Sequence, residues 1–352
     1  MPDRAHDVAP RRGSRRETAP PPRTNRGQPS RGTYAALDLG TNNCRLLIAR
    51  AQGEGFIVID AFSRIVRLGE GLAASGRLSD VAMDRAVAAL AICADKLKRR
   101  NVTLVRSVAT EACRRATNGR AFVARVREET GIQLEIITAE QEARLAVTGC
   151  QALLEPGTGP ALVFDIGGGS TELVLLDDDD GGAPGIEDWF SAPWGVVSLS
   201  ESEPHIGVDD DARRAAYARM REHVARAIRG FGDVLARRGA RPGRLLGTSG
   251  TVTTLASLYL DLPNYDRRAV DGLIVPSAAM RGLSQRLAGM SVTERAQLPC
   301  IGAERADLVV AGCAILDAIL DLWPAERLSV ADRGIREGIL RRLMAHETGE
   351  RA

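Results

Sequence analysis

The sequence has 352 residues, of which 44% are hydrophobic and 26% charged, and its formal net charge is +2 at pH 7. These values are those of an ordinary globular protein, and no apolar run approaches the roughly 18 residues of a membrane-spanning helix. Because the charge is nearly balanced, overall electrostatics predict neither a nucleic-acid nor a membrane partner, and a site for a polyanion has to be local.

The length and the cysteines set two further expectations. A chain of this length favours two domains that share a cleft. The six cysteines occur singly, without metal-ligand spacing, and no apolar signal segment precedes them. They are Cys44, Cys93, Cys113, Cys150, Cys300 and Cys313. We therefore expect reduced thiols and a cytoplasmic protein.

Residues 1–32 are rich in Arg, Pro, Gly and Ser and contain almost no apolar side chains. Such a segment cannot bury enough surface to offset the entropy of ordering it, so the sequence predicts a disordered basic tail. The tail is either a variable extension or an electrostatic trap for a polyanion. Order is expected to begin at Thr33.

The ordered part contains an internal repeat that pairs Asp38 with Asp165, an offset of 127 residues. In each copy an apolar run leads into a polar or glycine-rich turn and then into a second apolar run; the segments are 34–37, 38–43 and 46–49, and then 161–164, 165–170 and 173–176. Each copy predicts strand, tight turn, strand. A repeat about one domain long indicates duplication of a whole α/β unit, because solenoid repeats span only about 20–50 residues.

The rest of the chain alternates helix and strand patterns, as expected for α/β layers. Apolar stripes at three- and four-residue spacing predict a helix after Ser79, its expected N-cap, and a long helix from Asp209 to Arg238 that ends at Gly239. Short apolar runs at 102–105, 134–137 and 244–246 predict strands. Ligands are expected at the turns that follow such strands.

The turn that begins at Asp165 carries the strongest chemical signal. Backbone amides can reach phosphate oxygens there without a Cβ in the way, because the turn consists of Gly167, Gly168, Gly169 and Ser170. Asp165 and Glu172 stand at its two ends, where carboxylates can hold a Mg²⁺ that bridges to the same phosphate. A plain glycine hairpin with an aspartate cap is the simpler alternative.

Two further turns would complete such a site. The first copy keeps the acid and one glycine and adds polar donors, which makes it the expected opposite wall; its residues are Asp38, Gly40, Thr41, Asn42 and Asn43. A third turn, with Gly247, Ser249 and Gly250, precedes an apolar stretch and would place a phosphate or nucleoside at a helix N-terminus. Each turn taken alone also fits a hairpin or a helix start.

Charged side chains near these turns have simpler explanations as well. Arg114 follows a predicted strand and has the planar fork that suits a phosphate, but it also fits a solvated helix face. Glu140 and Glu142 fall in the first turn of a predicted helix, where either can act as a general base or merely complement the helix dipole. The acidic run 177–180 is expected to be a solvated hairpin turn.

These motifs together resemble the exopolyphosphatase/guanosine pentaphosphate phosphohydrolase (Ppx/GppA) family, of the acetate-kinase, sugar-kinase, Hsp70 and actin superfamily. The resemblance covers nearly all of residues 33–345 in family order and rests on segments 36–43, 66–72, 109–114, 142–145, 165–172, 247–251 and 335–338. It implies the short form of the family, with two ribonuclease-H-like (actin-like) domains flanking a cleft. The first would span 33–145, completed by a C-terminal helix near 334–352, and the second 146–333.

The resemblance also implies a role for each matching residue. Glu142 would be the catalytic carboxylate that orients or deprotonates the attacking water, a choice over Glu140 that rests on the resemblance alone. Arg114 would grip the terminal phosphates. Asp165 and Glu172 would bind the metal, Mg²⁺ or Mn²⁺, and the turns at 38–43 and 167–170 would cradle phosphate. The family is also compatible with a homodimer.

Three departures from the family pattern concern the site. Asn43 and Cys44 stand where the family usually has serine and an aromatic or branched residue, and Gln141 stands where an acid is common. The segment 310–313 replaces a turn that is common before the last apolar helix. Grip on the substrate is the property that these departures would alter.

The sequence therefore predicts a phosphohydrolase that releases terminal phosphate from polyphosphate, from guanosine pentaphosphate (pppGpp), or from both, by Mg²⁺-assisted in-line attack of water. A phosphohistidine route is not expected, because no motif contains a histidine; the four are His6, His205, His223 and His346. Two alternatives stay open on the same fold: a sensor that binds (p)ppGpp or another nucleotide without turning it over, and a small-molecule kinase.

Overall fold

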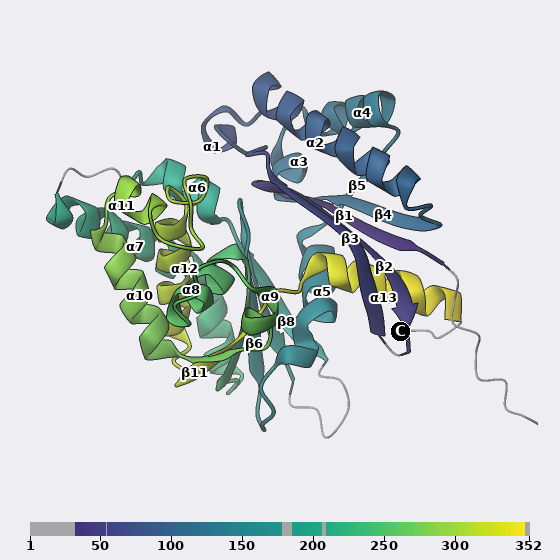
Figure 1. The fold of residues 1–352 in the computed structure, drawn as a ribbon. Coiled ribbons are helices and arrows are strands. Elements are labelled where there is room, and N and C mark those ends of the chain that lie inside the picture. Colours follow the sequence, from purple (N-terminus) through teal and green to yellow (C-terminus); the bar gives the residue numbers. More distant parts are fainter. Residues whose placement is uncertain (1–31, 54, 178–184, 206–208, 349–352) are drawn as a thin grey trace, which may run out of the picture.

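The computed structural model describes residues 32–53, 55–177, 185–205 and 209–348, which form two lobes with a sheet in each (Figure 1). The predicted tail at 1–32 lies outside the described residues except for Gly32, and so does the acidic run 177–180 except for Asp177. Of the described helices, none is both long enough and apolar enough to cross a membrane.

Both sheets share one topology. The first has the order β3-β2-β1-β4-β5, with β1 (Tyr34–Leu39), β2 (Asn43–Gln52), β3 (Gly55–Ile65), β4 (Leu104–Ala109) and β5 (Leu134–Ile136). The second has the order β10-β11-β9-β6-β7-β8, with β6 (Ala161–Ile166), β7 (Thr171–Leu176), β8 (Ile186–Ala192), β9 (Arg244–Thr248), β10 (Ile274–Pro276) and β11 (Arg327–Ala331). In each, an antiparallel meander of three strands is followed by two parallel strands, and β10 adds one further edge.

The internal repeat is reproduced in hydrogen bonds and strand register. The amide of Gly40 donates to the carbonyl of Asn43 over 2.9 Å, and the amide of Gly167 donates to the carbonyl of Ser170 over the same distance. Each turn therefore has one shape in both lobes. The predicted α/β fold with two similar domains is confirmed, while the boundaries expected near 145 and 333 stay a prediction.

Helices cover the outer faces of both sheets (Figure 1). The first lobe carries α1 (Leu72–Ser75), α2 (Asp80–Arg99), α3 (Glu111–Arg115) and α4 (Gly119–Thr130). The second carries α6 (Val196–Ser202), α7 (Asp210–Arg237), α8 (Gly250–Tyr259), α9 (Arg267–Val270), α10 (Ser277–Gly289), α11 (Val292–Ala296) and α12 (Val309–Leu322). The expected N-cap Ser79 accepts a bond from a backbone amide of α2, and the structure adds Asp209 as the N-cap of α7. Gly239 adopts φ 74°, the left-handed conformation that ends a helix.

Two helices lie between the sheets and touch each other. Apolar residues of α5 (Ala139–Cys150) pack on the second sheet, and those of α13 (Ile335–Thr348) pack on β1 and β2 of the first. Their backbones approach closely because glycine stands at the crossing. A Cβ on Gly149 would overlap the carbonyl of Gly334, and one on Gly338 would overlap the carbonyl of Leu145.

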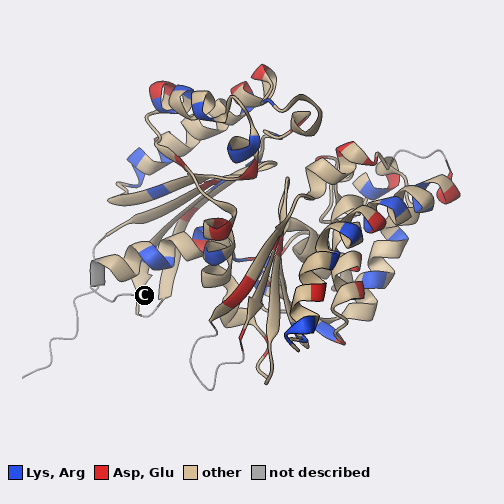
Figure 2. Ribbon diagram, turned by 180° about the vertical axis from the view of Figure 1, so that it is seen from behind, with Lys and Arg blue, Asp and Glu red and all other residues tan. Residues whose placement is uncertain are grey.

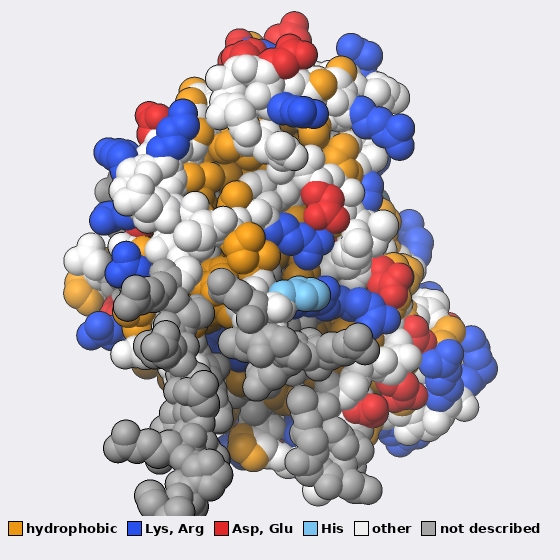
Figure 3. All heavy atoms as spheres, turned by 90° about the vertical axis from the view of Figure 1, so that its right-hand side faces the viewer, with side chains coloured by type: hydrophobic (Ala, Val, Ile, Leu, Met, Phe, Trp, Pro, Cys, Tyr) orange, Lys and Arg blue, Asp and Glu red, His pale blue; other side chains and the backbone are white. Residues whose placement is uncertain are grey.

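The surface carries both signs of charge. Figure 2 shows basic and acidic residues interspersed along the outer helices of both lobes. On the side seen in Figure 3, hydrophobic side chains are exposed among charged ones. The first lobe exposes the large apolar residues Ile57, Val58, Val81, Leu104 and Val105.

The helix crossing gives a prediction about stability. Gly338→Ala should destabilise the protein by roughly 1–3 kcal/mol, because the new methyl group forces α5 and α13 apart. The measurement is chemical denaturation followed by circular dichroism. Gly230→Ala is the matched control: Gly230 lies in α7 with open space around its Cα, so alanine there should stabilise by about 0.5–1 kcal/mol. Equal stability of the two variants would contradict the close packing of α13 on α5 at Gly338.

Candidate active site

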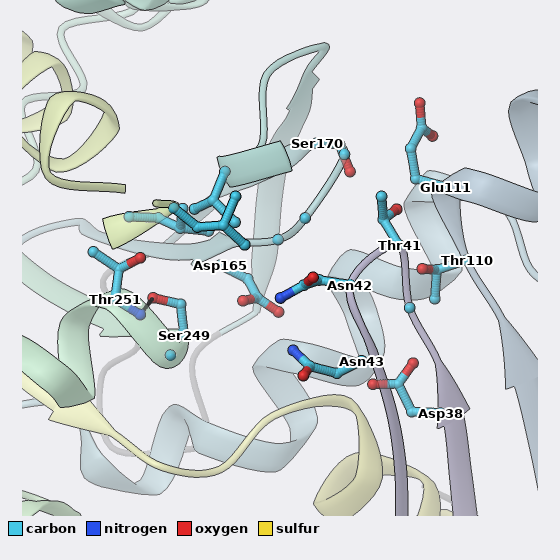
Figure 4. A pocket seen from close by; sticks show the side chains of 18 of the residues that line it. Asp38, Thr41, Asn42, Asn43, Thr110, Glu111, Asp165, Ser170, Ser249 and Thr251 are labelled. Atoms are coloured by element: carbon cyan, nitrogen blue, oxygen red, sulfur yellow. Dashed lines mark hydrogen bonds between the residues drawn. The ribbon is translucent and has the colours of Figure 1, made fainter. Parts of the chain in front are cut away.

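Three turns from the two lobes converge on one pocket with a cavity of about 140 Å³. The turn after β1 forms one wall, the turn after β6 forms the opposite wall, and the start of α8 closes one end. In Figure 4 the side chains of Asn42 and Asp165 point toward one another across this space, with Asn43 beside them. Strands that start from separate sheets thus deliver their carboxyl-terminal turns to a common point.

The pocket brings together thirteen of the sixteen residues predicted for the site. These are Asp38, Gly40, Thr41, Asn42, Asn43, Glu142, Asp165, Gly167, Gly168, Gly169, Ser170, Ser249 and Gly250. The described lining does not include Arg114, Glu172 or Gly247. Gly247 lies in β9, where a Cβ would come within 2.6 Å of the ring of Phe164, so its small size serves the core.

The glycines of the second turn allow the two turns to touch. A Cβ on Gly168 would lie 2.9 Å from Cβ of Thr41, and a Cβ on Gly169 would lie 2.9 Å from Oγ1 of Thr41. Neither glycine has a positive φ, so close approach rather than backbone conformation requires them. Their amides have no hydrogen-bond partner among the described residues, which leaves them available for a ligand oxygen.

Glu142 is held at the pocket by Arg114. The guanidinium donates from Nη1 to Glu142 Oε2 over 3.0 Å and to the carbonyl of Ile137 over 2.8 Å, and from Nη2 to Glu111 Oε2 over 2.8 Å. Glu142 and Glu111 line the pocket, while Arg114 lies behind them. Burial, and then the charge of Glu172, raise the pKa of Glu142 well above its ordinary value, although Arg114 opposes this. A carboxyl group with a raised pKa is suited to act as a base near neutral pH.

The two aspartates of the repeat are partly buried and line the pocket. Burial, followed by the charge of Glu172, raises the pKa of Asp165 to about 8. Burial also raises the pKa of Asp38, against the opposing charges of Arg45 and Arg336. Within the described part of the chain, Asp38 Oδ1 and Asn42 Oδ1 are buried without a hydrogen-bond partner. Buried, unpaired oxygens of this kind are a fit for a hard divalent cation.

The protein oxygens would supply only part of a metal's coordination. The described residues contain no group of three or more His, Cys, Asp or Glu side chains that could hold a metal ion. Mg²⁺ commonly binds through one or two carboxylates and completes its octahedron with water and substrate phosphate, so the set present suits it. Glu172 lies opposite Asp165 in the register of β6 and β7, and its Oε1 accepts bonds from Ser170 (2.7 Å) and Ser191 (3.0 Å).

The third turn presents the N-terminus of α8. Ser249 caps this helix, because its Oγ accepts bonds from the amides of Thr251 and Val252, each over 3.1 Å. The side chains of Ser249 and Thr251 both lie at the pocket (Figure 4). The helix dipole therefore adds partial positive charge at this end.

The departures from the family pattern have local explanations. Gln141 preserves the capping box of α5. Its Oε1 accepts a bond from the backbone amide of Thr138, and the backbone amide of Gln141 donates to Thr138 Oγ1. Cys44 is buried, with its Sγ 4.0 Å from Sγ of Cys93. The segment 310–313 is helical and belongs to α12, where Gly312 packs against the side chain of Thr251.

The sequence analysis missed several residues that line the pocket. Besides apolar neighbours, they are Arg45, Thr110, Glu111, Thr251, Thr254 and Arg305. The repeat could have identified Arg45. This residue occupies in the first copy the position that Glu172 occupies in the second. In strand register it lies opposite Asp38, as Glu172 lies opposite Asp165. Arg305 precedes α12 in a segment that has neither a strand nor a periodic apolar pattern to single it out.

Comparisons with known proteins agree with this geometry. The model of the Ppx/GppA phosphatase family matches residues 47–347. Exopolyphosphatase 2 of Mycobacterium tuberculosis is 34% identical over 87% of this chain and 96% of its own. A putative exopolyphosphatase of Haemophilus influenzae is 29% identical over 87% of this chain and 90% of its own.

Solved structures agree on the fold. The crystal structure of the Aquifex aeolicus member of the Ppx/GppA family has a TM-score of 0.72 and 30% identity, and the match covers 90% of this chain and 98% of that one. An exopolyphosphatase from Cytophaga hutchinsonii has a TM-score of 0.78 at 24% identity, covering 91% and 99%. The predicted two-domain, actin-like fold is thereby confirmed. The chain belongs to the Ppx/GppA phosphatase family.

Proposed function

We propose that this protein is an exopolyphosphatase, which releases orthophosphate from the end of polyphosphate, and that it also accepts the terminal phosphate of pppGpp. The observation that carries the proposal is the buried Glu142 carboxylate in the same pocket as two facing phosphate-binding turns. A hydrolase needs both a group that takes a proton from water and donors for the phosphate oxygens. The curated relatives described as exopolyphosphatases support the same reaction.

The balance of charge supports a divalent metal. The charged residues that line the pocket are four acids, Asp38, Glu111, Glu142 and Asp165, and two arginines, Arg45 and Arg305. With its carboxyl groups ionised, such a pocket repels a polyanion unless cations are added. When bound, Mg²⁺ or Mn²⁺ would neutralise charge on the phosphate oxygens. Asp165 and Asp38, with Asn42 beside them, are the residues that would hold it, and Glu172 would support Asp165 from the next strand.

The chain's own groups then divide the work. Glu142 accepts the proton of the attacking water at its carboxylate, and Arg114 keeps that carboxylate pointed at the pocket. The amides of Gly168 and Gly169 and the α8 N-terminus bind phosphate oxygens and orient the terminal phosphorus for in-line attack. Arg114 could bind phosphate directly only if its guanidinium released Glu111 and donated to the substrate instead.

The central test is Glu142→Gln. The variant keeps shape and loses the basic carboxylate, so kcat should fall by a factor of about 10² or more, with a much smaller change in KM. The measurement is orthophosphate release from long-chain polyphosphate and, separately, from pppGpp, in the presence of Mg²⁺. The ratio of the two wild-type rates identifies the preferred substrate.

Glu140→Gln is the matched control for this test. Glu140 lies two residues away on the same helix, is about half exposed, and pairs with Arg144 over 3.0 Å. Its substitution should leave kcat within about twofold, because an exposed pair contributes little. Equal losses in the two variants would contradict the assignment of the base. Binding of pppGpp without release of phosphate by wild type would favour the sensor.

A second test concerns the metal. Addition of Mg²⁺ should raise the melting temperature of wild type, because the ion relieves repulsion among the buried carboxylates. Asp165→Asn should abolish this rise, since it removes the pocket-facing charge of the β6 turn. Asp188→Asn is the control, because Asp188 is on β8 of the same sheet but outside the pocket lining, paired with Arg238. The same Mg²⁺-dependent rise in Asp165→Asn and wild type would rule Asp165 out as a ligand.

A further inference from the structure

Segment 66–71 of the first lobe is fastened to the first phosphate-binding turn. The amides of Val66 and Arg67 donate to the carbonyl of Asn42 over 2.8 and 3.0 Å, and the amide of Gly69 donates to the carbonyl of Thr41 over 2.9 Å. Gly69 also lies against the Thr41 side chain, where a Cβ would overlap Cγ2. Three backbone hydrogen bonds and one close side-chain contact therefore tie the segment to the turn.

The same segment reaches across to the second lobe at two points. Arg67 forms a two-pronged bond with Asp307, from Nη1 to Oδ2 over 2.7 Å and from Nη2 to Oδ1 over 3.1 Å, and Nη2 also donates to the carbonyl of Glu304 over 3.1 Å. The amide of Gly71 donates to Glu201 Oε1 over 2.8 Å. Bidentate pairing of arginine with a carboxylate is the strong and directional form of an ion pair.

Both contact points on the second lobe are themselves attached to the pocket. Glu201 is in α6, and at the start of that helix the amides of Val196 and Val197 donate to the carbonyls of Gly167 and Gly168 over 3.0 and 2.8 Å. Asp307 lies between Arg305 and Leu308, which both line the pocket. The hydrogen bonds thus connect one phosphate-binding turn through segment 66–71, Glu201 and α6 to the other turn, and the Arg67–Asp307 pair adds a second bridge between the lobes.

The backbone conformation of Arg67 indicates that the surrounding structure holds this residue in place for its contact with Asp307. Arg67 has φ 46°, in the left-handed region that a residue with a long side chain rarely adopts. Such a conformation costs free energy and persists only where the surroundings hold it. Here the Asn42 carbonyl holds the amide, Arg85 donates to the carbonyl from Nη2 over 3.2 Å, and Asp307 holds the side chain.

We propose that segment 66–71 is an interdomain clasp, in which Arg67 and Asp307 are positioning residues that set the separation of the two phosphate-binding turns. Neither residue lines the main pocket, so neither is expected to touch the phosphate that reacts. With the clasp closed, the amides of the second turn and the side chains of the first face the same phosphate. The inference extends the proposed function, because it explains how the two halves of that site are held in register.

The test measures the distance between the lobes and the kinetics on the same variants. Spin labels at Val81→Cys and Tyr259→Cys, which are exposed positions on opposite lobes, report the distance distribution by pulsed electron resonance. Cys300→Ser removes the partly exposed native thiol, and the other five cysteines are buried. Arg67→Gln, Asp307→Asn and the double variant are compared with this labelled background, and unlabelled versions are assayed for phosphate release from long-chain polyphosphate.

Arg67→Gln should lengthen and broaden the distance distribution and raise KM about fivefold, the factor that corresponds to about 1 kcal/mol, with kcat changed less than about twofold. Asp307→Asn should do the same, and the double variant should add little to either single change, because both remove one interaction. Arg125→Gln is the control: Arg125 is similarly exposed and bonds two carboxylates, Asp84 and Glu129, within the first lobe. Arg125→Gln should change neither the distance distribution nor KM.

Several outcomes would overturn the clasp: an unchanged distance distribution in Arg67→Gln, a lower melting temperature without a change in distance, or fully additive effects in the double variant. The distance measurement needs no turnover, so it separates this inference from the proposed function. If the wild type releases no phosphate while Arg67→Gln still widens the distribution, the clasp stands and the proposed hydrolase activity fails.

Discussion

The site depends on the contact between two turns that belong to different sheets. Thr41 and Asn42 of the first turn lie against Gly168 and Gly169 of the second at distances that leave no room for a Cβ. Side chains larger than hydrogen at these glycines would push the lobes apart, and the carboxylates and amides that share the pocket would separate with them. Close packing of the glycine backbone against Thr41 and Asn42 is therefore the condition for a composite site.

The same closeness has an electrostatic cost. It gathers Asp38, Asp165, Glu142 and Glu172 in a partly or fully buried cluster, and burial raises the pKa of each. The folded chain supplies too few cations to neutralise these carboxyl groups. Arg114 is shared between Glu142 and Glu111, and Arg45 acts on both aspartates. A pocket with such a concentration of carboxyl groups is suited to bind cations and phosphate together, since each ligand compensates the charge of the other.

Much of this arrangement was predictable from the sequence, for identifiable reasons. The repeat at an offset of 127 residues predicted both turns and their strands, because the spacing of acid, glycine and apolar residues is a local property. The functional choice of Glu142 over Glu140 came from family resemblance and stays a prediction; Glu142 lines the pocket, whereas Glu140 is about half exposed and paired with Arg144. The contact of Arg114 with Glu142, the packing role of Gly247 and the place of Arg305 depend on tertiary contacts that no local pattern encodes.

Duplication produced two turns of one shape but not of one charge. Arg45 and Glu172 occupy equivalent places opposite the two equivalent aspartates, so the second copy of the repeat has an anion where the first has a cation. A pocket built from two identical halves would present the same face to both sides of a phosphate chain. This one is electrostatically asymmetric, so a polyphosphate chain bound there under the proposed function would meet a cation on one side and an anion on the other.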